Sequence, residues 1–110
     1  TSSRRQRQMC IRDSIKSFSK CIRGNHYHKF TTQHILITKG NLEYWYKDLN
    51  EIDQEPKFLV ANENDLITTP PLEIHALKIE KENHFIVFAS GLRGGKDYEN
   101  DTFRVDPIVK

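Results

Sequence analysis

Short apolar stretches alternate with polar turns from about residue 20 to the end of the chain. In QHILIT (33–38), Gln33, Ile35 and Ile37 fall on one side of an extended chain and the residues between them on the other. Alternation with a period of two is typical of a half-buried β-strand. The sequence therefore predicts a strand here, followed by a turn at KGN.

The next stretch, LEYWYKDL (42–49), continues the same period with aromatic residues, which favour strands. Its alternation places Tyr44 and Tyr46 on one face and Trp45 on the other. The polar, acidic residues 47–57 that follow predict a hairpin tip.

The remaining strands are short and closely spaced. They are expected at 58–61, 66–69, 75–79, 84–90 and 102–105. No segment shows a helical period over ten or more residues, and we find no repeat or linker. This pattern predicts a single all-β domain, a sandwich or a small barrel.

Composition agrees with a folded domain of this size. The 110 residues are 36% hydrophobic and 29% charged, as in ordinary globular proteins. No apolar run approaches the roughly 20 residues that cross a bilayer, so we expect no membrane partner.

The formal charge of +2 does not indicate nucleic-acid binding. Residues 1–14 carry four arginines and one aspartate, while the remaining 96 residues carry 13 basic and 14 acidic side chains. All of the positive excess therefore lies in the first 14 residues, and we expect no nucleic-acid partner.

That basic segment differs from the rest of the chain. RRQRQMCIRDS back-translates to a sequence that resembles a transposase-based sequencing adapter. We therefore expect residues 1–14 to be non-native and residues 15–110 to form the domain, truncated at its natural N-terminus. The alternative is a genuine basic tail. With Cys10 in this segment, Cys21 is left as a lone thiol, which favours a reduced, cytoplasmic setting.

Histidines carry the candidate chemistry. His26 and His28 are two residues apart, so on a strand they project together. Neutral imidazoles are common ligands for Fe, Mn, Ni, Cu or Zn. Gln33 and His75 are candidates for further ligands, whereas His34 should face the opposite way. The alternative is a hydrogen-bonded polar pocket without metal.

Two stretches resemble the paired motifs of the cupin superfamily. In HYHKFTTQHILITKG, His26, His28 and Gly40 keep the spacing of the first motif, although Gln33 stands where glutamate is usual. In PPLEIH, residues 70–75, the proline and histidine of the second motif are present, but leucine replaces the usual glycine.

The resemblance implies a double-stranded β-helix, or jelly roll, with a divalent transition metal (Fe, Mn, Ni or Zn). Its ligands would be His26, His28 and His75, with Gln33 as the fourth. A neutral amide is a poorer ligand than a carboxylate for a hard cation, and it cannot act as a base.

RGNHYHK and GGKDYENDTFRV resemble small RmlC-like cupins of bacterial polysaccharide and nucleotide-sugar biosynthesis. This implies a sugar-like small-molecule ligand and epimerase or isomerase activity, with His28 or His75 as the catalytic base. Arg23 would meet a phosphate or carboxylate. The rings of Tyr44 and Tyr46 would suit a sugar, although core packing is an alternative role.

Two other classes of function remain open. One is a metal-dependent oxygenase or lyase, and the other is a non-catalytic ligand-binding module. Because many cupins pair through sheet edges, we expect a homodimer.

Overall fold

The computed structural model describes residues 9–17, 20–51, 53–90 and 101–109. Within these ranges the chain forms strands and turns, and no helix is long and apolar enough to cross a membrane. The strands of the described residues are β1 (Met9–Ser17), β2 (Cys21–His28), β3 (Thr32–Lys39), β4 (Leu42–Asp48), β5 (Lys57–Ala61), β6 (Leu66–Thr69), β7 (Glu73–Ile79), β8 (Asn83–Ser90) and β9 (Thr102–Arg104).

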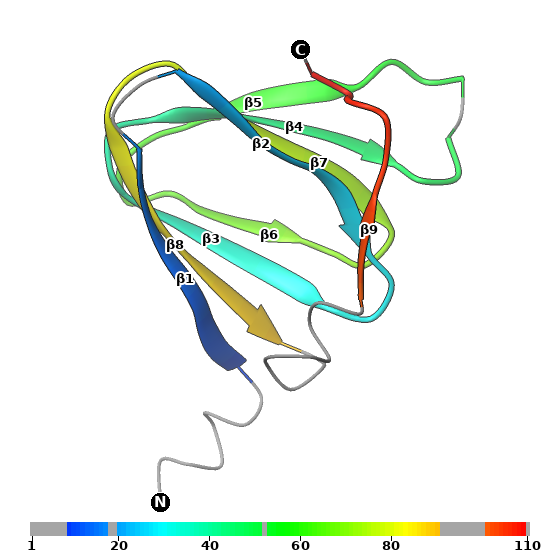
Figure 1. Cartoon of the computed structure of the whole chain (residues 1–110), viewed down its shortest axis with the longest axis horizontal. Coiled ribbons are helices and arrows are strands. Elements are labelled where there is room, and N and C mark those ends of the chain that lie inside the picture. The colour runs from blue at the N-terminus through cyan, green and yellow to red at the C-terminus, as the bar shows by residue number, and fades with distance from the viewer. Residues whose placement is uncertain (1–8, 18–19, 52, 91–100, 110) are drawn as a thin grey trace, which may run out of the picture.

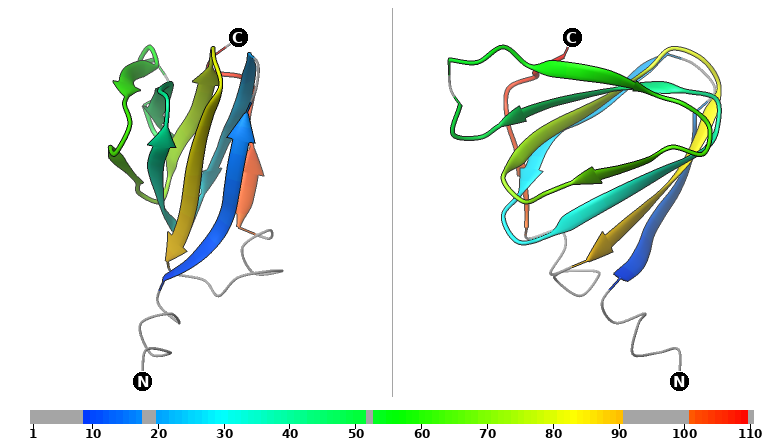
Figure 2. Two further views of the ribbon diagram at one scale, coloured as in Figure 1. Left: turned by 90° about the vertical axis from the view of Figure 1, so that its left-hand side faces the viewer. Right: turned by 180° about the vertical axis from the view of Figure 1, so that it is seen from behind.

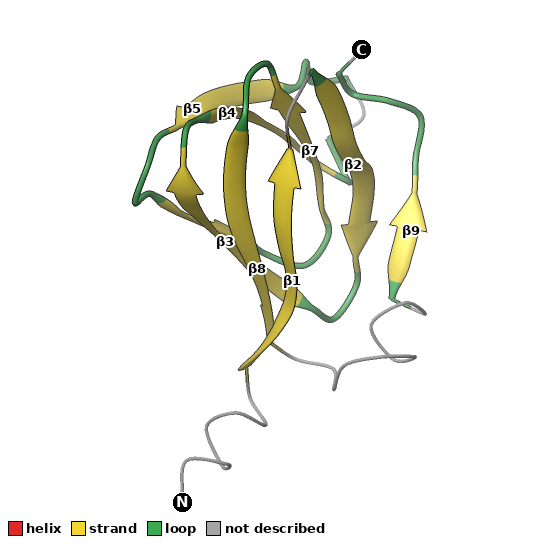
Figure 3. Ribbon diagram, turned by 60° about the vertical axis from the view of Figure 1, so that its left-hand side comes forward, coloured by secondary structure: helices red, strands yellow, loops and turns green. Residues whose placement is uncertain are grey.

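The strands form two antiparallel sheets that face each other (Figures 1 and 3). One sheet has the order β1-β8-β3-β6, and the other has the order β5-β4-β7-β2-β9. Strands adjacent in sequence often lie in opposite sheets, so the chain crosses repeatedly between the layers. This all-β, two-sheet arrangement confirms the fold class that the sequence predicts.

The alternation in β3 is borne out residue by residue. Gln33, Ile35 and Ile37 are buried, whereas the residues between them are only partly covered. Ile35 pairs with Val87 and Ile37 with Phe85 on the neighbouring β8. Directly paired residues of antiparallel strands project to the same side, so these four side chains build one apolar layer.

Both sheets contribute to the core through such inward-facing positions. The core cluster contains Ile35, Ile37, Leu42, Tyr44, Ala61, Ile67, Leu77, Ile79, Phe85 and Val87. Most of these residues are aliphatic. The buried polar residues include His28 on β2, Gln33 on β3 and His75 on β7.

The hairpin expected after β4 is present. β4 pairs with β5 from Leu42 opposite Ala61 to Tyr46 opposite Lys57. β5 is an edge strand, and its residues Phe58, Leu59 and Val60 are 53%, 43% and 52% exposed. An apolar edge of this kind is unusual on an isolated monomer.

The first strand was not predicted from the sequence. β1 pairs with β8 along its length, from Met9 opposite Ser90 to Ser17 opposite Asn83 (Figure 2). Residues 9–14 of the segment expected to be non-native therefore lie within a sheet. The boundary proposed at residue 14 does not coincide with a boundary of structure, and the origin of residues 1–14 stays a prediction.

Candidate functional site

A β-bulge in β2 sets the direction of its histidines. Gly24 pairs with Ala76 and His26 pairs with His75, so Asn25 is one extra residue on β2. Gly24 and Asn25 both have positive φ, 94° and 58°. A Cβ on Gly24 would lie 2.8 Å from the backbone oxygen of His75. Glycine therefore permits both the conformation and the close approach of the two strands.

Beyond the bulge, cross-strand pairing assembles the site. His75 on β7 pairs with Tyr46 on β4 on one side and with His26 on β2 on the other. His26 also pairs with Arg104 on β9. Residues paired in this way share a face of the sheet. His28, two residues beyond His26, projects to the same inner side.

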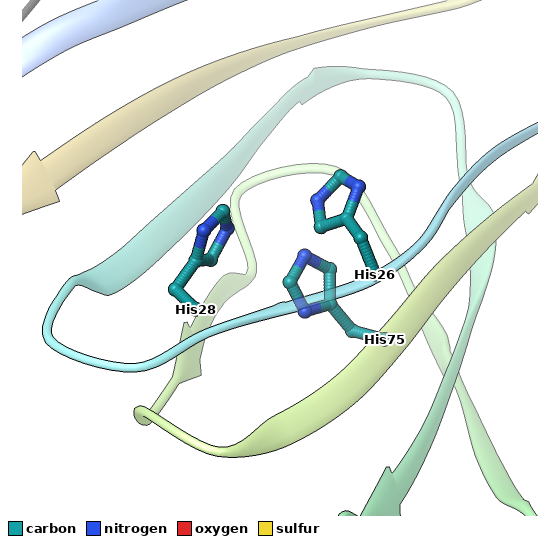
Figure 4. Close-up of side chains that lie close together, drawn as sticks. All are labelled: His26, His28 and His75. Carbon is teal, nitrogen blue, oxygen red and sulfur yellow. The ribbon is translucent and has the colours of Figure 1, made fainter. Parts of the chain in front are cut away.

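The three imidazole rings lie side by side (Figure 4). Their centroids are 5.0 Å apart for His26 and His28, 4.6 Å for His26 and His75, and 5.4 Å for His28 and His75. One nitrogen from each ring lies within 4.8 Å of the others. The structure thus brings together the three histidines that the sequence singled out.

Burial keeps these rings neutral. His28 and His75 are 1% and 2% exposed. Burial, with the neighbouring imidazoles, lowers the pKa of His75 from 6.5 to about 3. Burial, then His28 and Arg104, lowers the pKa of His26 to about 4. Burial also lowers the pKa of His28, against the opposing effect of its hydrogen bond to the backbone of Asp101.

The hydrogen bonds of the rings suit a metal site. Nδ1 of His75 lies 3.3 Å from the carbonyl oxygen of Glu73, and Nδ1 of His28 lies 3.1 Å from that of Asp101. Because a carbonyl can only accept, each Nδ1 donates, and in the neutral ring Nε2 keeps its lone pair. Among the described residues, the buried Nδ1 of His26 has no hydrogen-bond partner.

The spacing of the nitrogens approaches that of a single-ion site. Ligand nitrogens about 2.1 Å from one metal lie at most about 4.2 Å apart. The three nitrogens lie within 4.8 Å of one another, so the rings would move toward a common centre to bind one ion. Neutral, oriented imidazoles at this spacing could hold a divalent transition metal.

Gln33 reaches the cluster from the opposite sheet. It is 5% exposed, pairs with Thr69 of β6, and lies near enough to His28 to affect the pKa of that ring. The side-chain amide is therefore close to the imidazoles at the position where the resemblance implies a fourth ligand. His34, by contrast, bonds to Thr68 at an exposed position, which confirms that it faces away.

Leu72 occupies a left-handed conformation, with φ of 68°. Its N–H donates to the carbonyl of His28, 2.7 Å away, and its own carbonyl accepts from the N–H of Leu49. Leucine is unfavourable at positive φ, whereas glycine is not. This explains physically why glycine is usual at this place in the second motif.

A second polar group lies on the inner faces of β4 and β7. The hydroxyl of Tyr44 donates to Glu73, 2.9 Å away, and hydrogen-bonds to Thr69. Burial raises the pKa of Tyr44, and burial followed by the charge of Asp48 raises the pKa of Glu73. Tyr44 and His75 stack with their ring centroids 6.4 Å apart, so this group adjoins the histidines.

An open cleft of about 420 Å³ lies between the edges of β5 and β6. Tyr44, Tyr46 and Glu73 line it together with Leu59 and Leu66. The two tyrosines, stacked with their ring centroids 5.7 Å apart, thus share the inner face that the alternation predicted.

Arg23 is placed differently from the two tyrosines. It is exposed and pairs with Leu77, which itself pairs with Tyr44, so the three form one row across the sheet. At about 4.8 Å per strand, the backbones of Arg23 and Tyr44 lie roughly 10 Å apart. Arg23 does not line the cleft.

Sequence reasoning missed several polar residues near the histidines. Glu73 could have been found, because it precedes His75 by two residues and so shares its face. Thr69, Asp101 and Arg104 gave no comparable signal, since they reach the site only through the pairing of distant strands.

Comparison by sequence yields no relative: no family model and no curated protein matches the chain. Solved structures do match. The capsular polysaccharide assembling protein CapF from Staphylococcus aureus superposes with a TM-score of 0.72 at 15% identity, over 86% of this chain and 27% of that protein.

Two further structures have related folds. A mutant of the QdtA 3,4-ketoisomerase from Thermoanaerobacterium thermosaccharolyticum, in complex with TDP, has a TM-score of 0.67 at 23% identity, over 84% of this chain and 64% of that enzyme. Oxalate decarboxylase from Bacillus subtilis also has a TM-score of 0.67, at 20% identity, over 84% of this chain and 23% of that enzyme.

These proteins are RmlC-like jelly rolls, and the alignments cover 84–86% of this chain. The chain has the cupin fold. The chain spans about a quarter of CapF and of oxalate decarboxylase and under two thirds of QdtA.

The lowered pKa values predict how stability depends on pH in metal-free protein. In the unfolded chain His26 and His75 take up protons near pH 6.5, but in the fold only near pH 4 and pH 3. Between these values the unfolded state binds more protons, so the free energy of unfolding falls as pH falls. The two histidines make their full contribution to the free energy of unfolding above pH 6.5.

Urea unfolding at a series of pH values across this window measures the effect. The pH dependence should be smaller in His75→Gln than in the unmodified protein. An unchanged dependence would show that His75 protonates equally in the folded and unfolded states.

Proposed function

We propose that this cupin binds a sugar-like small molecule beside a divalent transition metal (Fe, Mn, Ni or Zn). We propose further that it acts as an epimerase or isomerase in bacterial polysaccharide or nucleotide-sugar biosynthesis, in the cytoplasm. The observation that carries the proposal is the buried cluster of three neutral imidazoles. The folds of CapF and QdtA support the pathway by analogy alone.

In this proposal His26, His28 and His75 supply nitrogen ligands and Gln33 supplies a carbonyl oxygen. All four groups are neutral, so none of them would offset the charge of a bound dication. When bound, such an ion would act as a Lewis acid toward a substrate carbonyl. The site would therefore favour substrates that present an electron-rich oxygen.

The catalytic base depends on whether metal is present, because one Nε2 cannot serve both roles. In metal-free protein we favour His28 over His75. With a pKa of about 3, His75 is a very weak base near neutral pH. Burial lowers the pKa of His28 as well, but the hydrogen bond to the backbone of Asp101 and the nearby Gln33 oppose this effect, so neutral His28 could accept the proton from the carbon next to a sugar carbonyl.

Metal analysis tests the central element of the proposal. The purified protein should contain stoichiometric transition metal, and the His26→Ala, His75→Ala double variant should lose it, because two of the nitrogen ligands are gone. Elemental analysis by mass spectrometry measures both contents.

The matched control is His34→Ala, which removes an imidazole that faces away from the cluster. This variant should retain its metal. Equal metal content in the double variant and in the control would contradict the metal site, and full activity of metal-free protein would favour His28 as a base.

We place the sugar ring of the ligand against Tyr46 in the cleft and a phosphate near Arg23. Tyr46 is the more available ring, since the hydroxyl of Tyr44 is already hydrogen-bonded to Glu73 and Thr69. Among the described residues, two carboxylates, Asp65 and Glu73, line the cleft and no basic side chain does. It therefore suits the neutral ring of a ligand, and the phosphate must lie elsewhere.

TDP binding tests the phosphate contact. A hydrogen bond to a charged group contributes about 1.5–3 kcal/mol, so Arg23→Ala should weaken TDP affinity about tenfold or more. Isothermal titration calorimetry measures this, with Lys39→Ala as the control because Lys39 is an exposed cation paired with Glu82. Equal affinities of the two variants would exclude the role of Arg23.

A metal-dependent oxygenase or lyase is the second candidate. The three-histidine cluster favours it, because such donor sets leave coordination positions open for substrate. Stoichiometric metal without turnover of keto sugars linked to TDP would favour this class. Binding without any turnover would identify a ligand-binding module.

We also propose that the protein is a homodimer. The exposed apolar side chains Phe58 and Val60 of the edge strand β5 support this proposal, because pairing with a second chain would cover them. Light scattering on the purified chain should give twice its mass of 13.0 kDa, and the mass of a single chain would contradict the proposal.

A further inference from the structure

One buried carboxylate holds the turn between β2 and β3. Asp101 is 3% exposed and directly precedes β9, which lies beside the end of β2 (Figure 1). Its oxygens accept hydrogen bonds from the backbone N–H groups of Lys29 at 2.9 Å, Phe30 at 3.0 Å and Thr31 at 2.9 Å. Three successive N–H groups around one anion form a tight backbone nest.

These hydrogen bonds keep the carboxylate ionised. Burial alone would raise the pKa of Asp101, but the bonds from Phe30, Thr31 and Lys29 outweigh it, and the pKa lies below its ordinary value. A neutral group in place of this buried carboxylate would hold the turn less firmly, because it cannot accept all three N–H hydrogen bonds equally well.

The backbone of the same residue contacts the site. The carbonyl oxygen of Asp101 lies 3.1 Å from Nδ1 of His28, and the hydroxyl of Thr102 lies 3.5 Å from the same nitrogen. Because the carbonyl can only accept, Nδ1 must carry the proton of the neutral ring. The proton position on one ring nitrogen decides which nitrogen remains available to a metal or to a substrate proton.

We propose that Asp101 is a positioning residue for His28. Its carboxylate anchors residues 29–31, and this anchoring aims its carbonyl at Nδ1 of His28. The ring is thereby held in the tautomer whose Nε2 lone pair can serve the cluster with His26 and His75. Asp101 itself contacts neither metal nor substrate.

The inference deepens the proposed function, because it concerns the residue that serves there as ligand or base. The tautomer is nevertheless a property of the metal-free chain, so it can be measured whether or not the protein binds metal or turns over a sugar.

The experiment records long-range ¹H–¹⁵N NMR spectra of the full metal-free chain labelled with ¹⁵N-histidine. His28 is assigned by the signal that disappears in His28→Gln. In the unmodified protein His28 should show a protonated Nδ1 and an unprotonated Nε2. The opposite tautomer in the unmodified protein would overturn the proposal without any Asp101 variant.

Asp101→Asn should then populate the second tautomer of His28 and weaken Zn²⁺ affinity about 10- to 100-fold, as loss of an orienting group does. Asp106→Asn, which changes an exposed carboxylate of the same C-terminal segment, should alter neither the tautomer of His28 nor the affinity for Zn²⁺. An unchanged tautomer in folded Asp101→Asn would overturn the proposal.

If Asp101→Asn does not fold, Asp101→Glu decides. It keeps the charge that the nest requires but displaces the main chain, so His28 should become a mixture of tautomers in a folded protein. A pure Nδ1–H tautomer in this variant would contradict a positioning role. A correct tautomer in a protein that binds no metal would leave this inference standing and reject only the metal site.

Discussion

The pairing of β2 with β7 is the interaction on which the site depends. It sets His26 opposite His75 and holds the two backbones so close that only glycine fits at position 24. β7 in turn pairs with β4 and so brings Tyr46 to the other side of His75. One backbone ladder thus determines which imidazoles and aromatic rings meet inside the barrel.

The interior is divided between an apolar part and a polar part. Apolar residues such as Ile37 and Phe85 fill the first part. In the second, the cost of burying charge keeps the imidazoles neutral, and backbone carbonyls satisfy Nδ1 of His28 and of His75. Tyr44 belongs to both parts, since its ring lies in the core and its hydroxyl bonds to Glu73.

Much of this arrangement could be predicted from the sequence. The two-residue period of 33–38 and 42–48 predicted strands and the faces of their side chains, because half-buried strands leave a local signature. β1 was missed, because its sequence shows no such period. The three histidines could be linked only because their motifs resemble those of a known superfamily. Asp101 could not be linked to them, because it lies 70 residues from Thr31 in the sequence and contacts the turn through hydrogen bonds from backbone N–H groups.

The departures from the cupin motifs have different physical meanings. Gln33 keeps the place of a carboxylate but loses its charge, which changes what the site can bind. Leu72 keeps the left-handed turn but does so in a conformation unfavourable to leucine. A backbone conformation can therefore be retained after the residue best suited to it has been replaced, because the surrounding hydrogen bonds still require that conformation.

Asn25 has a consequence for comparing this strand with distant relatives. Cys21 packs against the core. If β2 alternated strictly from Cys21 onward, His26 and His28 would face solvent. The extra residue of the bulge turns them inward. A relative with a regular strand would reach the same geometry with one residue fewer. An alignment without a gap at this point would match either the core positions or the histidines, but not both.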